Sequence, residues 1–123
     1  MGKRVLVVDD QKGYRELLKI YLSKLDYELK EASDGLQALD RLHEDDFDLI
    51  ICDILMPNMD GWGVLKEVRS DERIKNIPVI VLTAKDEDAD MFKGYDLGAN
   101  YYLTKPFMKT QLLYGVKIFD EGR

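Results

Sequence analysis

Cysteine and histidine are almost missing from this sequence, which contains one of each, Cys52 and His43. A single cysteine excludes an intramolecular disulfide and a cysteine-rich metal site. A single histidine excludes a zinc site built from several histidines and argues against a Ser-His-Asp triad. We expect Cys52, inside an apolar run, to be a small buried side chain and His43 to lie on the surface. Other residue types must therefore carry the chemistry of this protein.

Long apolar runs and an excess of positive charge are lacking as well. No run approaches the roughly 20 residues that span a bilayer, and Val5–Val8 is too short for the core of a signal peptide. The 18 lysines and arginines stand against 24 aspartates and glutamates, which gives a formal net charge of −6. A surface that binds nucleic acid or anionic lipid needs the opposite balance. The sequence therefore predicts a cytoplasmic protein with no direct nucleic-acid partner and no membrane partner.

What the sequence does contain is a regular alternation of two patterns over 123 residues, the length of one domain. Short apolar runs predict strands, and amphipathic patterns with a period of three to four residues predict the helices that follow them. The predicted strands are residues 5–8, 27–32, 49–52, 79–82 and 101–104. This alternation predicts an α/β fold, a five-stranded parallel sheet with helices on both faces. The strand 27–32 is the most polar and is expected near the sheet edge.

The helical patterns have recognisable ends. The predicted helices contain the apolar residues of 14–25, 36–42, 64–68 and 108–119, and a fourth helix in chain order that begins near Asp86–Asp90. Acidic residues at a helix start complement the positive end of its macrodipole, and Gly98 is expected to end that helix. We also expect Gly61, in the loop before residues 64–68, to adopt a positive φ.

Polar residues occupy the positions where four of the predicted strands end. They are Asp9, Asp10, Asp53, Thr83 and Lys105. In a parallel α/β sheet the ligand binds in the crevice beyond these strand ends. Three carboxylates there repel one another, so they raise a pKa, hold a cation or do both. Oxygen ligands alone favour Mg²⁺, and a lysine and a threonine beside it suit a phosphoryl group that a carboxylate can accept.

Four segments of the sequence resemble one family. They are Val5–Asp10, Asp53–Gly61, the pair Thr83-Ala84 and the triplet 105–107, Lys-Pro-Phe. In this order and at this spacing they resemble the receiver domain of two-component response regulators, in particular a chemotaxis-regulator-like single-domain receiver. The resemblance covers essentially the whole chain. It implies a flavodoxin-like (βα)5 fold with residues 1–123 as the receiver domain and no output domain in this chain.

The resemblance implies a role for each residue at the strand ends. Asp53 would accept the phosphoryl group. Asp10 would bind Mg²⁺ directly and Asp9 through water, while Asp53 itself and the backbone carbonyl of Leu55 would complete the protein's share of the ligands. Lys105, whose bond to the following proline is expected to be cis, would pair with the resting Asp53 carboxylate and hold a phosphoryl oxygen.

The resemblance also implies a switch. Thr83 would swing its hydroxyl onto the phosphoryl group, and Tyr102 would turn inward behind it. The face made by the fourth helix, the strand 101–104 and the last helix would change as a result. Leu55 and Lys85 would flank the path of the attacking water and set the lifetime of the phosphoryl group. The domain would catalyse only its own phosphorylation and slow dephosphorylation, so it would not be an enzyme with external substrates.

Partners follow from the same resemblance. The phosphodonor would be a histidine kinase or a histidine phosphotransfer protein, and the output would be a downstream protein target. The sequence names neither of them. It also leaves open whether the domain is a monomer or a phosphorylation-dependent dimer, and whether it stands alone or is part of a larger protein.

Each site residue also has a purely structural interpretation. Asp9 and Asp10 can end a strand and cap a helix. Thr83 is a frequent strand residue, Lys105 can be a solvated loop charge, and Tyr102 can pack on the sheet. The presence of Asp53 at the end of a wholly apolar strand makes this interpretation less satisfactory for the two aspartates.

Two other functions stay open. A phosphohydrolase of the haloacid dehalogenase superfamily also uses a strand-end aspartate and Mg²⁺, but it expects an acid two residues later, where this sequence has Leu55. An interaction module would keep the site without using it and would bind its partners constitutively. The complete set of acids, hydroxyl and lysine argues against the second alternative.

Overall fold

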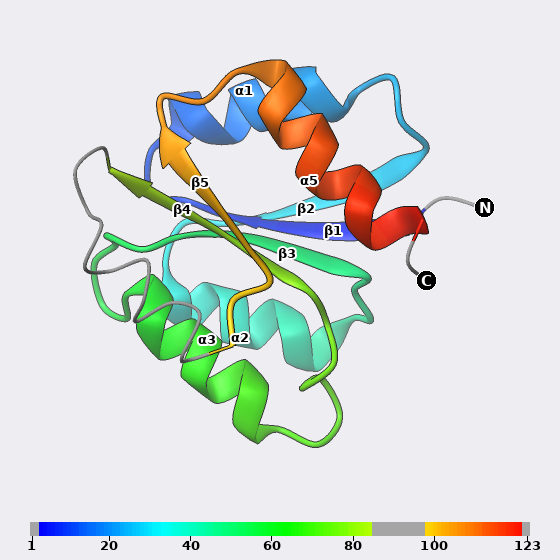
Figure 1. Ribbon diagram of the computed structural model, residues 1–123. Helices are drawn as coiled ribbons and strands as arrows, with labels where there is room; N and C mark the ends of the chain where they lie inside the picture. Colours follow the sequence, from blue (N-terminus) through cyan, green and yellow to red (C-terminus); the bar gives the residue numbers. More distant parts are fainter. Residues whose placement is uncertain (1–2, 85–97, 122–123) are drawn as a thin grey trace.

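The computed structural model describes residues 3–84 and 98–121 of the chain (Figure 1). In chain order the elements are β1 (Lys3–Val8), α1 (Lys12–Leu22), β2 (Tyr27–Ala32), α2 (Gly35–Glu44), β3 (Leu49–Asp53), α3 (Gly61–Ser70), β4 (Val79–Ala84), β5 (Tyr101–Lys105) and α5 (Lys109–Glu121). The predicted fourth helix with Asp86–Asp90, and also Lys85, lie outside the described residues. Gly98, where that helix is expected to end, has a positive φ of 98°.

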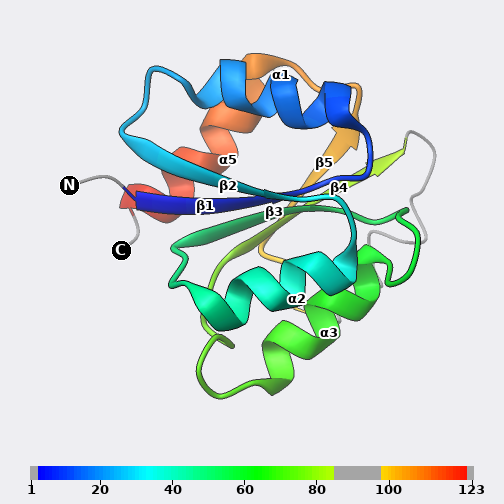
Figure 2. The same cartoon turned by 180° about the vertical axis from the view of Figure 1, so that it is seen from behind.

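The strands form one parallel sheet in the order β2-β1-β3-β4-β5. Helices α1 and α5 cover one face of the sheet, and α2 and α3 cover the other (Figures 1 and 2). The polar strand β2 lies at an edge, as predicted. This strand order is that of flavodoxin-like folds, so the predicted fold class is confirmed.

Alternate residues of the inner strands supply two hydrophobic cores, one on each face of the sheet. In β1, Leu6 and Val8 belong to the core under α2 and α3, while Val5 and Val7 belong to the core under α1 and α5. All four are at most 1% exposed, because helices cover both faces. Burial of each such side chain contributes about 1.5–3 kcal/mol. The strands therefore have fixed positions, and so do the residues at their ends.

Helix α1 ends earlier than its apolar pattern predicted. It stops at Leu22, and the hydroxyl of Ser23 donates a hydrogen bond of 2.7 Å to the carbonyl oxygen of Ile20. The backbone turns there to reach β2. Leu25 therefore lies beyond the helix, although it still packs against the core under α1 and α5.

Two apolar residues near helix starts are exposed, contrary to their predicted place on the buried face. Leu36 is 51% exposed, because Ala38 and Leu42 form the buried side of α2. Met108 is 65% exposed and precedes α5, whose buried side includes Leu112 and Val116. Among the described residues, no helix is long and apolar enough to cross a membrane.

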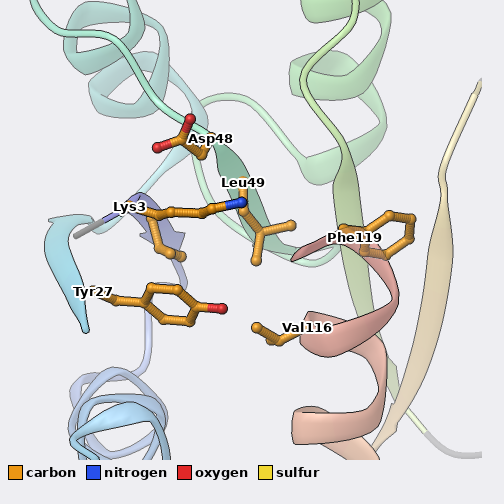
Figure 3. Close-up of a pocket in the computed structure, with 7 residues that line it drawn as sticks. Lys3, Tyr27, Asp48, Leu49, Val116 and Phe119 are labelled. Carbon is orange, nitrogen blue, oxygen red and sulfur yellow. The ribbon is translucent and has the colours of Figure 1, made fainter. Parts of the chain in front are cut away.

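The edge of the sheet where the strands begin carries a small pocket between the sheet and α5 (Figure 3). Lys3, Tyr27 and Leu49 line it from the strands, and Val116 and Phe119 line it from α5. We call the side of the sheet where the strands begin the amino edge, and the side where the strands end the carboxyl edge. At the amino edge, residues of the first strand, β1, and of the last helix, α5, therefore line the same pocket.

Candidate functional site

The predicted site residues lie together at the carboxyl edge. Asp9 directly follows β1, Asp53 is the last residue of β3, and Thr83 and Lys105 lie at the ends of β4 and β5. Because these strands pair in parallel and end at one edge, their terminal residues are neighbours. The continuously apolar strands place their last polar residues at the boundary between core and water.

Three carboxylates gather at this edge, and two of them are buried. Asp9 is 0% exposed and Asp53 is 6% exposed, whereas Asp10 faces solvent. One carboxylate oxygen from each residue lies within 4.8 Å of the others. Burial, followed by the charge of Asp9, raises the pKa of Asp53 to about 6, although Lys105 opposes the shift. The cluster therefore carries more negative charge than this lysine can balance.

Lys105 lies between two carboxylates and is closer to Asp9. Its Nζ is 2.7 Å from Oδ2 of Asp9 and 3.4 Å from Oδ2 of Asp53. It also donates a hydrogen bond of 3.2 Å to Oε1 of Gln11 and lies 4.0 Å from the centroid of the Tyr14 ring. The bond between Lys105 and the following proline is cis, as predicted. The predicted partner, Asp53, is thus within ion-pair distance, but the fully buried Asp9 is the nearer one.

Thr83 and Tyr102 lie on neighbouring strands. Thr83 is buried, and its hydroxyl oxygen is 3.4 Å from the carbonyl oxygen of Ala84. Tyr102 pairs with Val81 in the β4–β5 register, two residues before Thr83. Its ring packs against the core under α2 and α3, and its hydroxyl oxygen is buried. The movement of these two residues on phosphorylation stays a prediction.

The loop that follows Asp53 makes a close backbone contact at Gly61. The Gly61 N–H donates a hydrogen bond of 2.7 Å to the carbonyl oxygen of Ile54, and a Cβ at position 61 would lie 2.3 Å from the carbonyl oxygen of Asp53. The predicted positive φ at Gly61 is wrong, because the positive φ in this loop is at Asn58, at 69°. Glycine is needed at position 61 for space. Leu55 lies in the same loop with its side chain 63% exposed.

The start of α2 braces this loop through contacts that were not predicted. Asp34 caps α2, with Oδ1 accepting from the Gln37 N–H at 2.8 Å, and its Oδ2 accepts from Nδ2 of Asn58 at 2.7 Å. The Gly35 N–H donates to the carbonyl oxygen of Met59 at 3.2 Å. Hydrogen bonds to the carboxylate lower the pKa of Asp34. Aspartate before a helical pattern signals the cap, but nothing in the sequence signals its second bond.

The first turns of α1 also reach the site. Nη1 of Arg15 donates a hydrogen bond of 2.6 Å to the carbonyl oxygen of Asp9, and Nε donates to Oε1 of Glu31 at 3.0 Å. Arg15 therefore ties the end of β1 to β2. The helical pattern identified the apolar side of α1 and assigned Tyr14 to it, but it gave no signal for these contacts at the site.

The carboxylates fit a hard divalent cation. Their donor atoms are all oxygens, and the exposed Asp10 opens the cluster to solvent. Burial and, after it, the charge of Asp9 raise the pKa of Asp53, and a cation beside the carboxylate would oppose both effects. Cys52, next along the strand, is no competing ligand, because burial raises the pKa of its thiol and keeps it protonated. The cluster can therefore bind a metal ion.

A curated relative shares much of this sequence. Over 110 residues the chain is 42% identical to the probable transcriptional regulator ycf27 of Guillardia theta, in a match that covers 89% of this chain and 42% of that protein. The chain thus spans less than half the length of this relative.

Solved structures and a family profile agree on one assignment. A putative response regulator from Chloroflexus aurantiacus J-10-fl has 35% identity and a TM-score of 0.93, covering 97% of this chain and 98% of its own. The chemotaxis response regulator CheY4 of Vibrio cholerae has 33% identity and a TM-score of 0.90, covering 97% and 99%. Residues 5–117 match the profile of the response regulator receiver domain, which confirms the resemblance. The chain therefore belongs to the response regulator receiver domain family of two-component signalling.

Proposed function

We propose that this receiver domain accepts a phosphoryl group on Asp53, beside a bound Mg²⁺, and signals through a change of its surface. The observation that carries the proposal is the environment of Asp53. Its carboxylate is buried at a strand end, 3.4 Å from the ammonium of Lys105 and clustered with Asp9 and Asp10. A nucleophile surrounded by a metal-binding cluster and a lysine is suited to receive a phosphoryl group.

The transfer step uses Asp53 as its nucleophile. A carboxylate oxygen of Asp53 forms a bond to phosphorus as the phosphorus–nitrogen bond of a phosphohistidine breaks, and the histidine keeps the electron pair and gains a proton. Asp53 must be ionised to attack. Since its pKa is raised only to about 6, the carboxylate is mostly charged at neutral pH.

Four groups of the chain hold Mg²⁺ in this proposal. They are the carboxylates of Asp9, Asp10 and Asp53 and the backbone carbonyl of Leu55, with Asp9 acting through water. When bound, Mg²⁺ supplies positive charge that neutralises the phosphoryl oxygens. Lys105 binds a further phosphoryl oxygen, and its short distance to the Asp53 carboxylate supports this role.

The signal is carried by Thr83 and Tyr102 in this proposal. The hydroxyl of Thr83 moves to the phosphoryl group, and the ring of Tyr102 fills the space behind it. The outer surface of β5 and α5 changes, together with the predicted fourth helix, whose residues lie outside the described part of the chain. Exposed Tyr114 and Ile118 on α5, at 63% and 41% exposure, offer contacts for a downstream protein target on this face.

The partners are a histidine kinase or a histidine phosphotransfer protein as donor and one downstream protein target, in the cytoplasm, with no direct contact to nucleic acid or membrane. The domain is a monomer or a phosphorylation-dependent dimer. It is not an enzyme with external substrates, and it catalyses only its own phosphorylation and slow dephosphorylation. Leu55 supports this, since its exposed apolar side chain stands where a phosphohydrolase of similar chemistry would need an acid.

The test is phosphorylation by a small donor. The chain is incubated with acetyl phosphate and Mg²⁺, and intact-mass spectrometry measures the phosphorylated fraction. We expect one phosphoryl group on the wild type, none on Asp53→Asn, and none when EDTA replaces Mg²⁺. A matched variant at the amino edge, Asp48→Asn, should be labelled like the wild type.

Three outcomes would contradict the proposal. They are an unlabelled wild type, equal labelling of Asp53→Asn, and steady release of phosphate from a generic phosphomonoester, which would favour a phosphohydrolase. The surface change is tested separately by amide chemical shifts around Tyr102 on addition of beryllofluoride and Mg²⁺. Unchanged shifts would favour a constitutive interaction module.

A further inference from the structure

The side chain of Lys105 lies beside an uncharged aromatic ring, that of Tyr14. The face of the Tyr14 ring, on α1, lies 4.0 Å from its Nζ. We propose that Tyr14 is a positioning residue for Lys105, whose ring holds the lysine ammonium at the phosphoryl site by a cation–π interaction. This inference rests on the proposed function, since the position of Lys105 matters only if a phosphoryl group arrives there.

The geometry favours a strong interaction. A cation is attracted to a ring when it lies within about 6 Å of the centroid, and the attraction grows when water is excluded. The side chain of Lys105 is only 11% exposed. The Tyr14 ring also contacts Phe107 at a centroid distance of 5.9 Å. Since Phe107 follows Lys105 by two residues, the ring is fixed to the same segment of chain that carries the lysine.

The ring provides something that the carboxylates cannot provide. The ammonium is held by Asp9 at 2.7 Å and Asp53 at 3.4 Å, and these are the groups proposed to bind Mg²⁺ and the phosphoryl group. Once they share their charge with a metal ion or a phosphorus atom, their attraction for Lys105 weakens. The attraction of the ring does not depend on that charge. It also uses none of the oxygen acceptors, so an N–H of the ammonium can donate to a phosphoryl oxygen.

Gln11 is too weak a substitute to account for this role. Its Oε1 accepts from Lys105 at 3.2 Å, but the residue is exposed, so water competes for the same bond. The plain alternative is that Tyr14 only packs against Phe107 as an apolar side chain. The two explanations differ in one property, the electron density on the face of the ring.

The experiment compares aromatic and aliphatic side chains at position 14. The initial rate of phosphorylation by acetyl phosphate is measured at saturating Mg²⁺ for the wild type, Tyr14→Phe and Tyr14→Leu. We expect Tyr14→Phe to stay within about twofold of the wild type, because it keeps the ring face. We expect Tyr14→Leu to be about three- to tenfold slower with unchanged Mg²⁺ affinity, because it keeps only apolar volume.

Tyr21 supplies the matched control. It lies two turns further along α1 and contacts the same Phe107 by its edge, at 6.3 Å. Tyr21→Leu should therefore lose a comparable ring contact without slowing phosphorylation more than about twofold, since it leaves the ring beside Lys105 in place. In the wild type and Tyr14→Phe, NMR should show the terminal side-chain protons of Lys105 shifted upfield by the ring, and Tyr14→Leu should lose this shift.

A second series keeps the test decisive if Tyr14→Leu does not fold. Phenylalanines with increasing numbers of ring fluorines, introduced at position 14, keep the shape of the ring and weaken its negative face. The rate should fall stepwise along the series. A rate independent of fluorination, a wild-type rate for folded Tyr14→Leu, or equal losses for Tyr14→Phe and Tyr14→Leu would overturn the inference.

The failure of the proposed function would look different. If Asp53→Asn is labelled like the wild type, phosphoryl transfer to Asp53 is wrong whatever the variants of Tyr14 do. If Asp53→Asn is not phosphorylated while all variants at position 14 are phosphorylated at one rate, the proposed function stands and only the role of Tyr14 is wrong.

Discussion

The two edges of the sheet carry ion pairs of the same kind in different surroundings. At the carboxyl edge, Lys105 and Asp9 are 2.7 Å apart, with 11% and 0% of their side chains exposed. At the amino edge, Arg4 and Glu28 are 3.1 Å apart, with 40% and 52% exposed. An exposed pair contributes little because water solvates both charges, whereas buried charges depend on their partners. Each charge at the carboxyl edge therefore depends strongly on the partner beside it, whereas the exposed pair at the amino edge contributes little and is screened by salt.

The largest expected effect concerns the close packing beside Asp53 at the carboxyl edge. Gly61→Ala places a Cβ 2.3 Å from the carbonyl oxygen of Asp53, so we expect it to lower the free energy of unfolding by about 3 kcal/mol, as overpacked sites do. Gly13→Ala is the matched control, because no atom lies within 4 Å of its added Cβ. Since Gly13 lies in a helix, that change should raise stability by up to about 1 kcal/mol. Urea unfolding measures both, and equal effects would contradict the close contact at the carboxyl edge.

The pH dependence of stability gives the next largest effect. The folded protein raises the pKa of Asp53 from 3.8 to about 6, so between these values it binds more protons than the unfolded chain. Stability without Mg²⁺ should therefore fall as pH rises from about 4 to about 6 and stay low above that. Asp53→Asn lacks this loss, so at pH 8 it should be more stable than the wild type by up to about 3 kcal/mol.

A measurement at acidic pH provides the internal control for this prediction. Below the unfolded pKa of 3.8, Asp53 is protonated in both states, so the advantage of Asp53→Asn should disappear. Chemical unfolding across the pH range measures the difference directly. Parallel profiles for the two proteins would show that the carboxyl edge does not penalise the charge of Asp53.

Stabilisation by Mg²⁺ should also differ between variants at the carboxyl edge and at the amino edge. A ligand that binds only the folded state adds stability, about 1 kcal/mol at several times its dissociation constant. The melting temperature of the wild type should rise with Mg²⁺, and that of Asp10→Asn should rise much less, because this change removes a ligand from the cluster. Glu28→Gln at the amino edge should respond like the wild type. An equal response of all three proteins would place the bound Mg²⁺ elsewhere.

The smallest effect belongs to the amino edge itself. Glu28→Gln removes the exposed pair with Arg4, and we expect a loss of less than about 0.5 kcal/mol at low salt. At about 1 M salt, which screens charges beyond a few ångströms, the loss should vanish. A loss that is larger or insensitive to salt would mean that the two edges differ less than their exposure suggests.

Much of the site was predictable because it depends on strand ends. The apolar run before Asp53 predicted a buried strand, and the parallel topology then brought its last residue beside Asp9. Periodicity and composition are local properties, and they decide which residues end each strand. Thr83 and Lys105 were placed at the same edge by the same argument.

What could not be predicted depends on contacts between distant segments. The bond from Asn58 to Asp34 joins residues that are 24 positions apart, and it exists only because α2 docks beside the loop after β3. Glycine is needed at position 61 because there is no space for a Cβ beside Asp53. The sequence pattern had instead suggested that Gly61 is needed for a positive φ. The preference of Lys105 for Asp9 over Asp53 is a difference of 0.7 Å, from 3.4 and 2.7 Å, which no residue pattern encodes.

The pocket at the amino edge has a practical consequence. Lys3, near the start of the described chain, and Phe119, near its end, line the same small space (Figure 3). Two fluorophores attached near these positions would therefore stay close together while the domain is folded, at the edge opposite Asp53. Energy transfer between them would report unfolding of the domain, and a dye attached near Tyr102 would be needed to follow phosphorylation.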